Sequence, residues 1–295
     1  MDLKLKLKNL RIKYNYSQEN IAEVLDISVR QYQRIENGDN KPSLDVLMNL
    51  SKIYNSNLIN DYILSNDSSY LYIKDLELEL KNIVFNMDID KLNIFINNIQ
   101  SAIYQEPKST HLSQILYFSK AYKLIVEKHY IKAKNYLEKS IFISIPDFEI
   151  KNIENYLYNK FDIKVLLHLG ISYKYLGQMD KHETIILFLC SLDLNDIELE
   201  LQIAHAKIKM HISKKNYIYS LEIINYYIKL IEDNHLYQHK FRFSYLKGLC
   251  LYKLDDSRCT KYFDDTLKAL KYYKLKNLYE QYNNAILKYK KFNEI

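Results

Sequence analysis

The sequence predicts an all-α protein made of a small N-terminal helical domain and a long body of paired helices. The chain of 295 residues contains only 4 Gly and 3 Pro, so few residues interrupt helices. Between residues 17 and 38, capping residues mark two short helices joined by a tight turn. Beyond residue 70, amphipathic segments of roughly 14–20 residues alternate with short breaks.

The first of the two short helices is expected at 18–25. Ser17 precedes it and is a favourable N-cap, because its hydroxyl can accept a hydrogen bond from an unpaired N–H of the first turn. One helical face is shared by Ile21, Ala22 and Leu25. A three-residue turn, Leu25-Asp26-Ile27, follows, as is typical of a helix-turn-helix unit.

The second short helix is expected at 28–37. Ser28 and Gln31 match the S/T-x-x-E/Q capping box, and Ile27 and Tyr32 stand at the positions of a hydrophobic staple. Gly38 sits just past the end, where a left-handed residue is favoured. Cap residues therefore predict both the start and the end of this helix.

The outward face of the second helix suits base recognition. At about 100° per residue, Tyr32 and Ile35 fall on the inward face. The opposite face carries Arg30, Gln33 and Arg34, with Val29 at its edge. Arginine can bridge two acceptors of guanine, glutamine can pair with adenine, and valine methyls can contact the thymine methyl. The pattern therefore predicts a helix that reads the DNA major groove.

At this point the sequence resembles a known family. The similarity lies in the runs SQENIAEVLDIS, RIENG and KPSLDVLMNL, which look like the helix-turn-helix domain of phage repressors, Cro proteins and the XRE group of bacterial regulators. It covers Leu3 to about Leu64 and implies a lambda-repressor-like domain with helices near 3–14, 18–25, 28–37, 43–54 and 57–64. One departure is Asp26, where the family usually has glycine; aspartate tolerates the left-handed region better than most residues.

The resemblance also implies which residues contact DNA. The family's phosphate-contacting glutamine corresponds to Gln18, and its backbone-binding loop corresponds to Asn37 and Lys41. Arg11 and Glu36 match a buried pair that ties the first helix to the recognition helix. The recognition residues correspond to Ser28, Val29, Arg30, Gln33 and Arg34.

Alternative interpretations stay open for some of these residues. Gln31 fits a cap better than a base contact, and Glu36 fits a structural role better than a functional one. Arg30 and Arg34 could lie on a merely solvated face; the surrounding motif, rather than their charge, favours DNA contact. Residues 1–64 hold nine Lys and Arg against eight Asp and Glu, although the whole chain carries +6. DNA binding would therefore depend on the local placement of Arg and Lys.

The protein is expected in the cytoplasm and is not expected to be an enzyme. Its cysteines, Cys190, Cys250 and Cys259, are an odd number without a secretory signal and are most simply reduced thiols. No run approaches the ~18 apolar residues of a membrane span. No zinc-ligand spacing, phosphate-cradling glycine loop, HExxH or GxSxG appears. The sequence therefore predicts no catalytic residue, no metal site and no cofactor.

The body is expected at 70–295, after a polar linker at 65–69 and a domain at 1–64. Its breaks share a form: KHYIKAKNYL at 128–137, GQMDKHETII at 177–186, KNYIYSLEII at 215–224 and DDSRCTKYFD at 255–264. The turn position recurs at Tyr130, Met179, Tyr217 and Ser257, with a weaker forerunner at Ile89. Spacings of 41, 49, 38 and 40 residues match two-helix repeats that stack into solenoids. The longest spacing contains an expected insertion at Ile145-Pro146-Asp147.

The body resembles TPR repeats, which implies a right-handed α-solenoid. Small residues stand where this repeat packs its helices closely, at Ala121, Gly170 and Gly248, and Ala133 matches its second small position. Three repeats depart from the pattern at that second position, with His182, Ser220 and Thr260.

The first helices of the pairs would line a concave face that suits an extended peptide or a partner helix. The expected repeat registers point six polar or aromatic residues into it: Lys164, His168, Gln202, His205, Arg242 and Tyr245. A lone polar residue on a helix surface is solvated more often than it is a ligand contact, so that alternative stays open for each of them. The sequence therefore predicts a peptide-binding face without proving a peptide.

Over nearly the whole chain, a helix-turn-helix domain followed by five or six TPR-like repeats resembles the Rgg/PlcR group of peptide-responsive regulators, the RNPP family. The resemblance implies a cytoplasmic homodimer that binds an inverted-repeat operator in double-stranded DNA. It also implies that a short imported signalling peptide binds the repeats and changes how the two DNA-binding domains are presented. The order of the domains supports this inference.

Two other classes of function stay open. The first is an XRE-type repressor whose repeats bind a protein partner or only dimerise, without a peptide ligand. The second is an enzyme regulated through its repeats, such as a phosphatase. That class would need a cluster of catalytic carboxylates or nucleophiles, which the sequence lacks.

Overall fold

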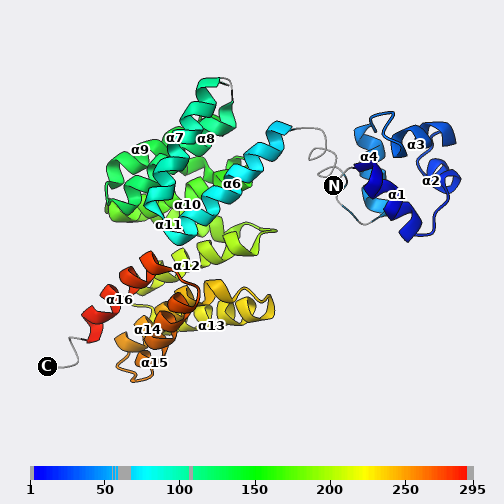
Figure 1. The fold of residues 1–295 in the computed structure, drawn as a ribbon. Helices are drawn as coiled ribbons and strands as arrows, with labels where there is room; N and C mark the ends of the chain where they lie inside the picture. Colours follow the sequence, from blue (N-terminus) through cyan, green and yellow to red (C-terminus); the bar gives the residue numbers. More distant parts are fainter. Residues whose placement is uncertain (1–2, 55, 57, 59–67, 106–108, 291–295) are drawn as a thin grey trace. The chain divides into compact units, whose positions relative to one another are not determined.

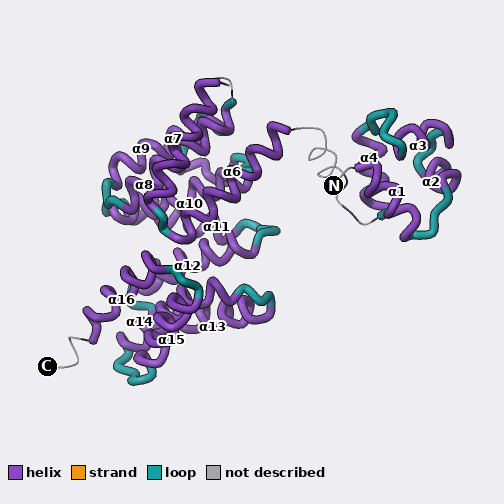
Figure 2. Tube along the Cα trace, in the orientation of Figure 1, coloured by secondary structure: helices purple, strands orange, loops and turns teal. Residues whose placement is uncertain are grey.

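The computed structural model describes residues 3–54, 56, 58, 68–105 and 109–290. Over these ranges the chain is helical and has no strand, which confirms the all-α prediction (Figure 1, Figure 2). The chain divides into two compact units, Met1–Leu78 and Glu79–Ile295. Among the described helices, none is both long and apolar enough to cross a membrane.

The N-terminal unit contains four of the five expected helices among its described residues. They are α1 (Leu3–Lys13), α2 (Gln18–Val24), α3 (Val29–Glu36) and α4 (Leu44–Ile53). The fifth, expected at 57–64, falls almost wholly outside the described residues, and so does most of the linker expected at 65–69. Ser68 and Ser69 open helix α6 (Ser68–Asn86), which contains the boundary between the compact units. The predicted domain limits therefore stay a prediction.

Cap residues define the helix-turn-helix as expected. The Ser17 hydroxyl accepts a hydrogen bond from the Asn20 N–H, and the Asn20 side chain accepts one from the Ser17 N–H, both at 3.1 Å. The Ser28 hydroxyl accepts from the Gln31 N–H at 3.2 Å. This is the first of the two hydrogen bonds of the capping box expected there. Asp26 (φ +53°) and Gly38 (φ +83°) are left-handed, so aspartate takes the role of the family's glycine in the turn.

One charged pair lies in the otherwise apolar core of the N-terminal unit. Glu36 is 4% exposed, and Arg11 donates to its two carboxylate oxygens at 2.7 and 3.1 Å. The Tyr32 hydroxyl donates to the same carboxylate at 3.3 Å. Burial would raise the pKa of Glu36, but the hydrogen bonds from Arg11, Gln18 and Tyr32 outweigh it and hold the pKa below its ordinary value. The expected tie between α1 and the recognition helix α3 is confirmed.

The C-terminal unit is built of helix pairs (Figure 1). Its first helices are α8 (Thr110–Val126), α10 (Lys160–Tyr175), α12 (Ile197–Ser213) and α14 (Lys240–Lys253). Their partners are α9 (Tyr130–Ser144), α11 (Met179–Ser191), α13 (Tyr217–Asp233) and α15 (Cys259–Tyr272). Helix α7 (Ile89–Gln105) precedes these pairs, and α16 (Lys276–Lys290) follows them. Two short 3-10 helices interrupt the series, at Ile150–Asn155 and Tyr237–His239.

The turns inside the pairs follow the predicted register. A left-handed residue lies two positions before every expected turn position, with φ between +51° and +76°, at Met87, Lys128, Gly177, Lys215 and Asp255. Helices α7, α9, α11 and α13 begin at the expected residues, which are Ile89, Tyr130, Met179 and Tyr217. The insertion expected near Ile145 is also present, because the first of the 3-10 helices follows it. The repeat register is therefore confirmed through α13.

The expected register fails in the last pair. Helix α15 begins at Cys259 rather than Ser257, because Asp256 caps a turn through hydrogen bonds with the N–H and the guanidinium of Arg258. Thr260, expected at the second small position, is exposed. Cys259 is buried at this position instead, so the residues of α15 face their neighbours one position earlier than predicted.

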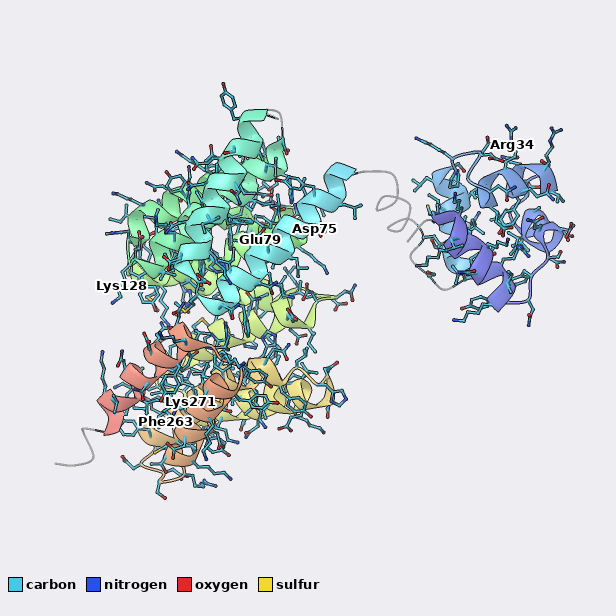
Figure 3. The ribbon with its side chains drawn as sticks, in the orientation of Figure 1. Arg34, Asp75, Glu79, Lys128, Phe263 and Lys271 are labelled. Atoms are coloured by element: carbon cyan, nitrogen blue, oxygen red, sulfur yellow. The ribbon has the colours of Figure 1, made fainter. Side chains whose placement is uncertain are left out.

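Two glycines allow close contact inside the pairs, as the sequence predicts. A Cβ on Gly248 would lie 2.8 Å from two ring carbons of Phe263, a residue of α15 labelled in Figure 3. A Cβ on Gly170 would lie 3.1 Å from the Cγ2 methyl of Ile185 on α11. Ala121 occupies the equivalent place on α8 and is fully buried.

We expect Glu36→Gln to lower the free energy of unfolding of the N-terminal unit by about 1–3 kcal/mol near neutral pH, because a charge-assisted pair is lost in a buried place. A lowered folded-state pKa stabilises the fold above the ordinary glutamate pKa of about 4.3, and this stabilisation disappears as the pH falls through the folded-state value. The difference between wild type and variant should therefore shrink in acid.

Urea unfolding of the full chain, followed through the methyl NMR signals of Leu7 and Ile21, measures this difference. Both side chains are fully buried in the same core as Glu36. Exposed Glu23→Gln is the control. A difference that stays constant with pH would contradict the ionised pair.

We also expect Gly248→Ala to destabilise the repeat body by about 1–3 kcal/mol, since the added methyl overlaps the buried Phe263 ring. Gly170→Ala should cost less, because Ile185 is 3.1 Å away and the helix propensity of alanine offsets up to about 1 kcal/mol. Urea unfolding of both variants gives the order. Equal losses would show that overlap with the ring is not the cause.

Candidate DNA-binding surface and candidate ligand-binding face

Helix α3 presents the predicted reading residues on its solvent side. Ser28, Arg30 and Arg34 are exposed, whereas Val29 and Gln33 are half-buried. Figure 3 shows Arg34 pointing away from the other helices of its unit. Tyr32, Ile35 and Glu36 lie buried on the opposite side of the helix. The expected division into an inward and an outward face is therefore present.

A relay of hydrogen bonds holds one of the reading residues in place. Glu36 is ionised and can only accept, so the amide nitrogen of Gln18 faces it and donates at 2.6 Å. The Gln18 oxygen is then free to accept from the Gln33 amide nitrogen at 3.1 Å. Gln33 donates through its amide nitrogen, so its own side-chain carbonyl oxygen is not part of the relay. The sequence predicted Gln18 only as a phosphate contact, and nothing in its spacing from Gln33 signals that the two side chains meet.

The loop after α3 carries the two remaining predicted contacts. Asn37 and Lys41 are both exposed. Between them, the N–H groups of Asp39 and Asn40 both donate to the Arg34 carbonyl, at 2.8 and 3.0 Å. The loop is therefore tied to the C-terminal end of the recognition helix, and Lys41 keeps a fixed relation to Arg30 and Arg34 on the helix.

The predicted ligand contacts on the repeats occupy equivalent positions. Lys164, Gln202 and Arg242 each stand six residues before the close-packing position of their helix, which is Gly170, Ile208 and Gly248 in turn. All three are half-buried. His205 and Tyr245 stand three residues before that position and are half-buried as well. These five therefore lie on corresponding faces of α10, α12 and α14.

His168 differs from the other predicted ligand contacts. It is 8% exposed, its ring packs edge-on against Phe118 at 4.9 Å and Tyr122 at 5.8 Å, and its Nδ1 lies 2.8 Å from the Lys164 carbonyl. Burial lowers its pKa to about 4, so the ring is neutral near pH 7. The prediction that His168 points into the concave face needs correction: the residue lies two positions before Gly170 and fills the packing between α8 and α10.

Tyr245 is also engaged by its neighbours. Its ring contacts Tyr282 at 4.8 Å between centroids and Phe263 at 6.0 Å. Burial raises its pKa, and so do the charge and hydrogen bond of the neighbouring Tyr289 hydroxyl. Only part of the side chain is therefore accessible to a ligand.

Lys174 and Lys209 belong to the same face, although the sequence analysis did not select them. Lys174 is the fourth residue after Gly170 and Lys209 the first after Ile208, which places both near the faces of Lys164 and Gln202. The Lys174 ammonium lies 3.5 Å from the Lys209 carbonyl. Equivalent positions on the other first helices are apolar or aromatic, as at Tyr122 and Ile212, so no repeated polar signal marks them in the sequence.

The turn between α6 and α7 connects the first repeat to the last. The Asn277 amide of α16 donates to the Met87 carbonyl at 3.1 Å. Phe85 packs edge-on against Phe241 of α14 at 6.4 Å. On α8, the Tyr122 hydroxyl donates to the Val84 carbonyl at 3.0 Å. Residues from both ends of the body therefore meet near the start of α14.

The described parts of the chain hold no group of three or more metal-ligating side chains. Cys190, Cys250 and Cys259 are free cysteines. Burial raises the pKa of Cys250 to about 12, so that thiol stays protonated at neutral pH.

Comparison with known protein families identifies the N-terminal part of the chain. Residues 7–59 match the family described as Helix-turn-helix. No curated protein sequence matches the chain.

Solved structures match over nearly the whole length. PlcR of Bacillus thuringiensis, solved in complex with the peptide PapR7 and DNA, is 17% identical, has a TM-score of 0.66, and the match covers 95% of this chain and 98% of that one. The pheromone receptor Rgg2 of Streptococcus dysgalactiae is 17% identical, with a TM-score of 0.54 and coverage of 98% and 99%. ComR of S. thermophilus, solved with DNA and its signalling peptide ComS, is 15% identical, with a TM-score of 0.51 and coverage of 98% and 99%. Residues 7–59 thus form a helix-turn-helix domain, and the chain as a whole has the fold of these three proteins.

Proposed function

We propose that this protein is a DNA-binding transcriptional regulator of the RNPP type. Its repeat body would bind a short intracellular signalling peptide and thereby change the affinity for the operator. The observation that carries the proposal is the combination of an exposed reading helix with a repeat body that shares its fold with proteins solved with peptide and DNA. The protein would act in the cytoplasm as a homodimer on double-stranded DNA.

The geometry of α3 supports sequence-specific DNA binding. Arg30 and Arg34 project from the side opposite the core, and Gln33 is held by the relay through Gln18 and Glu36. A reading residue whose rotamer is already fixed loses less conformational entropy on binding. Lys41, exposed on the tied loop, would contact the phosphate backbone and set the register of the helix on DNA.

A ligand on the repeats can change DNA binding only if it binds two conformations of the repeats with different affinity. Stacked repeats contact mainly their neighbours, so small rotations add up to a change in curvature, and a ligand that fits one curvature better shifts the population toward it. A tenfold change in operator affinity needs a coupling free energy of about 1.4 kcal/mol, and DNA must then change the peptide affinity by the same factor.

We expect Arg30→Ala to cost roughly 1–3 kcal/mol of binding free energy and to relax the preference at one base position, because a bidentate base contact is lost. Lys41→Ala should weaken binding to all sequences about equally. Gln31→Ala, an exposed neighbour on the same helix, is the control. Selection from a random duplex library, followed by affinity measurement on the selected sites, separates these effects. An unchanged sequence preference for Arg30→Ala would contradict its assignment as a base reader.

The same selection tests the dimer. One recognition helix covers few base pairs, so we expect selected sites to be inverted repeats with half-site centres about 10 bp apart or a multiple of that spacing. Analytical ultracentrifugation of the protein on such a site should give two chains per duplex. A single asymmetric half-site bound by one chain would contradict the proposed homodimer.

The peptide response is tested on the selected operator with peptides from the host's culture fluid. Operator affinity should change when the active fraction is added, and Gln202→Ala and His205→Ala should reduce this response because both residues lie on the first-helix face. An identical response in all three proteins would contradict the placement of the peptide. A wild type that never responds would favour a repressor whose repeats only dimerise or bind a protein.

A further inference from the structure

Three cations lie near one another on the first-helix face. Lys174 is near the end of α10, Lys209 is on α12 and Arg242 is at the start of α14. The Lys174 ammonium donates to the backbone carbonyl of Lys209 at 3.5 Å, so the end of its side chain lies beside α12. Lys160 of α10 and Lys240 of α14 form salt bridges with Asp196 and Glu232, and Glu198 of α12 pairs with Lys81. We call Lys174, Lys209 and Arg242 the cation cluster.

The charges of Lys174 and Arg242 both act on Lys209. Lys209 is exposed at its end, yet protein atoms surround it on several sides, and desolvation together with the charges of Lys174 and Arg242 lowers its pKa. Desolvation lowers the pKa of His205 well below its ordinary value, and the same three positive charges add to the effect. His205 is therefore neutral, and the surroundings favour an anion over a further proton.

Arg242 has hydrogen-bonding capacity that the fold does not use. Its guanidinium lies over the rings of Phe85 and Phe241, with distances of 5.2 and 5.5 Å to the ring centroids. Its Nε is buried and has no hydrogen-bond partner. An unsatisfied buried donor costs about 1–3 kcal/mol, so it calls for an explanation. A guanidinium has parallel N–H groups that can pair with the two oxygens of a carboxylate.

One acidic side chain of α12, Glu198, is engaged by groups outside the cation cluster. Glu198 shares a neighbour, His239, with Arg242, because both charges act on the His239 ring. The Glu198 carboxylate is already paired with Lys81, and it lies 3.9 Å from His239. The negative charge of Glu198 is therefore paired with Lys81 of α6 rather than with the cation cluster.

Aromatic groups from both ends of the body border the Arg242 side. The charge of Arg242 acts on Tyr122 of α8, where burial nevertheless raises the tyrosine pKa to about 12, and on Tyr282 of α16. Phe85 comes from α6. An anion here would therefore enter surroundings of low polarity, where its attraction to the guanidinium is stronger than in water.

We infer that the cation cluster is a carboxylate-binding subsite, with Arg242 as the bidentate partner and Lys174 and Lys209 as flanking charges. The inference rests on the proposed function and narrows its ligand: the peptide carries a carboxylate at this subsite, either its free C-terminus or an Asp or Glu side chain. A neutral, C-terminally amidated peptide would bring no charge for the three cations and would bind weakly.

The test uses the full-length chain and four pools of N-acetylated heptapeptides built from Leu, Ile, Val, Phe, Ala and Ser around one central residue. The central residue is Asp or Asn, and the C-terminus is free or amidated. Affinity selection with mass spectrometry ranks the pools, and fluorescence anisotropy of individual peptides gives the affinities. Peptides with a carboxylate should bind at least about tenfold more tightly than their neutral counterparts. Loss of affinity on amidation assigns the C-terminus, and loss on the change from Asp to Asn assigns the side chain.

Variants locate the effect. Arg242→Gln should remove about tenfold or more of the affinity for the carboxylate peptide and little of the affinity for the neutral one. Lys209→Gln, at an exposed position, should act in the same direction without disturbing the fold, so the test does not depend on the half-buried arginine alone. Lys229→Gln, an exposed lysine on the second helix α13, is the matched control.

The two hypotheses fail in different ways. If the wild type retains carboxylate and neutral pools equally, or if both cluster variants keep the full affinity, the subsite is wrong while peptide binding stands. If the wild type retains no member of any pool, the proposed peptide ligand and the subsite are both wrong.

Discussion

A pair of helices cannot bury its apolar face alone, and this constraint shapes the whole body of the protein. Each pair must pack on the next, so the chain repeats a unit with one left-handed residue at the turn and, in α8, α10 and α14, a small residue at the closest contact. Gly170 and Gly248 supply the small residue where Ile185 and the Phe263 ring approach. The first helices are then arranged side by side, and side chains far apart in the sequence meet: the charges of Lys174 and Arg242 both act on Lys209.

Features that depend on local backbone chemistry could be predicted from the sequence. The caps at Ser17 and Ser28 and the left-handed Asp26 and Gly38 follow from rules that involve only a few neighbouring residues. The turn positions of the repeats were predicted from breaks of similar form between the amphipathic segments. Only one of the five left-handed turn residues is a glycine, at 177, so glycines alone could not have predicted the register. It failed in the last pair, where hydrogen bonds between Asp256 and Arg258 delay the helix.

Features that depend on contacts between elements could be predicted only in part. The partner of Gln33 lies on another helix, and whether Gln18 reaches it depends on how Glu36 is held by Arg11. His168 sits beside the predicted face on a helical wheel, yet rings from the neighbouring α8 cover it. A rotation of one residue along a helix separates an accessible position from a buried one. The periodicity of a single helix cannot resolve this difference when several neighbours pack around it.

The contacts near Arg242 would connect the charge of the proposed ligand to the shape of the body. Phe85 beside the guanidinium precedes Met87, whose carbonyl accepts from Asn277, so one short stretch contacts both Arg242 and the last helix. An anion that draws the guanidinium toward itself would change the balance between its contact with Phe85 and its contact with Phe241, which are of similar length at 5.2 and 5.5 Å. Contacts of this kind are worth about 0.5–2 kcal/mol. That range includes the roughly 1.4 kcal/mol that a tenfold change in affinity requires, so a change at this one residue is large enough to shift the population between two curvatures of the repeats.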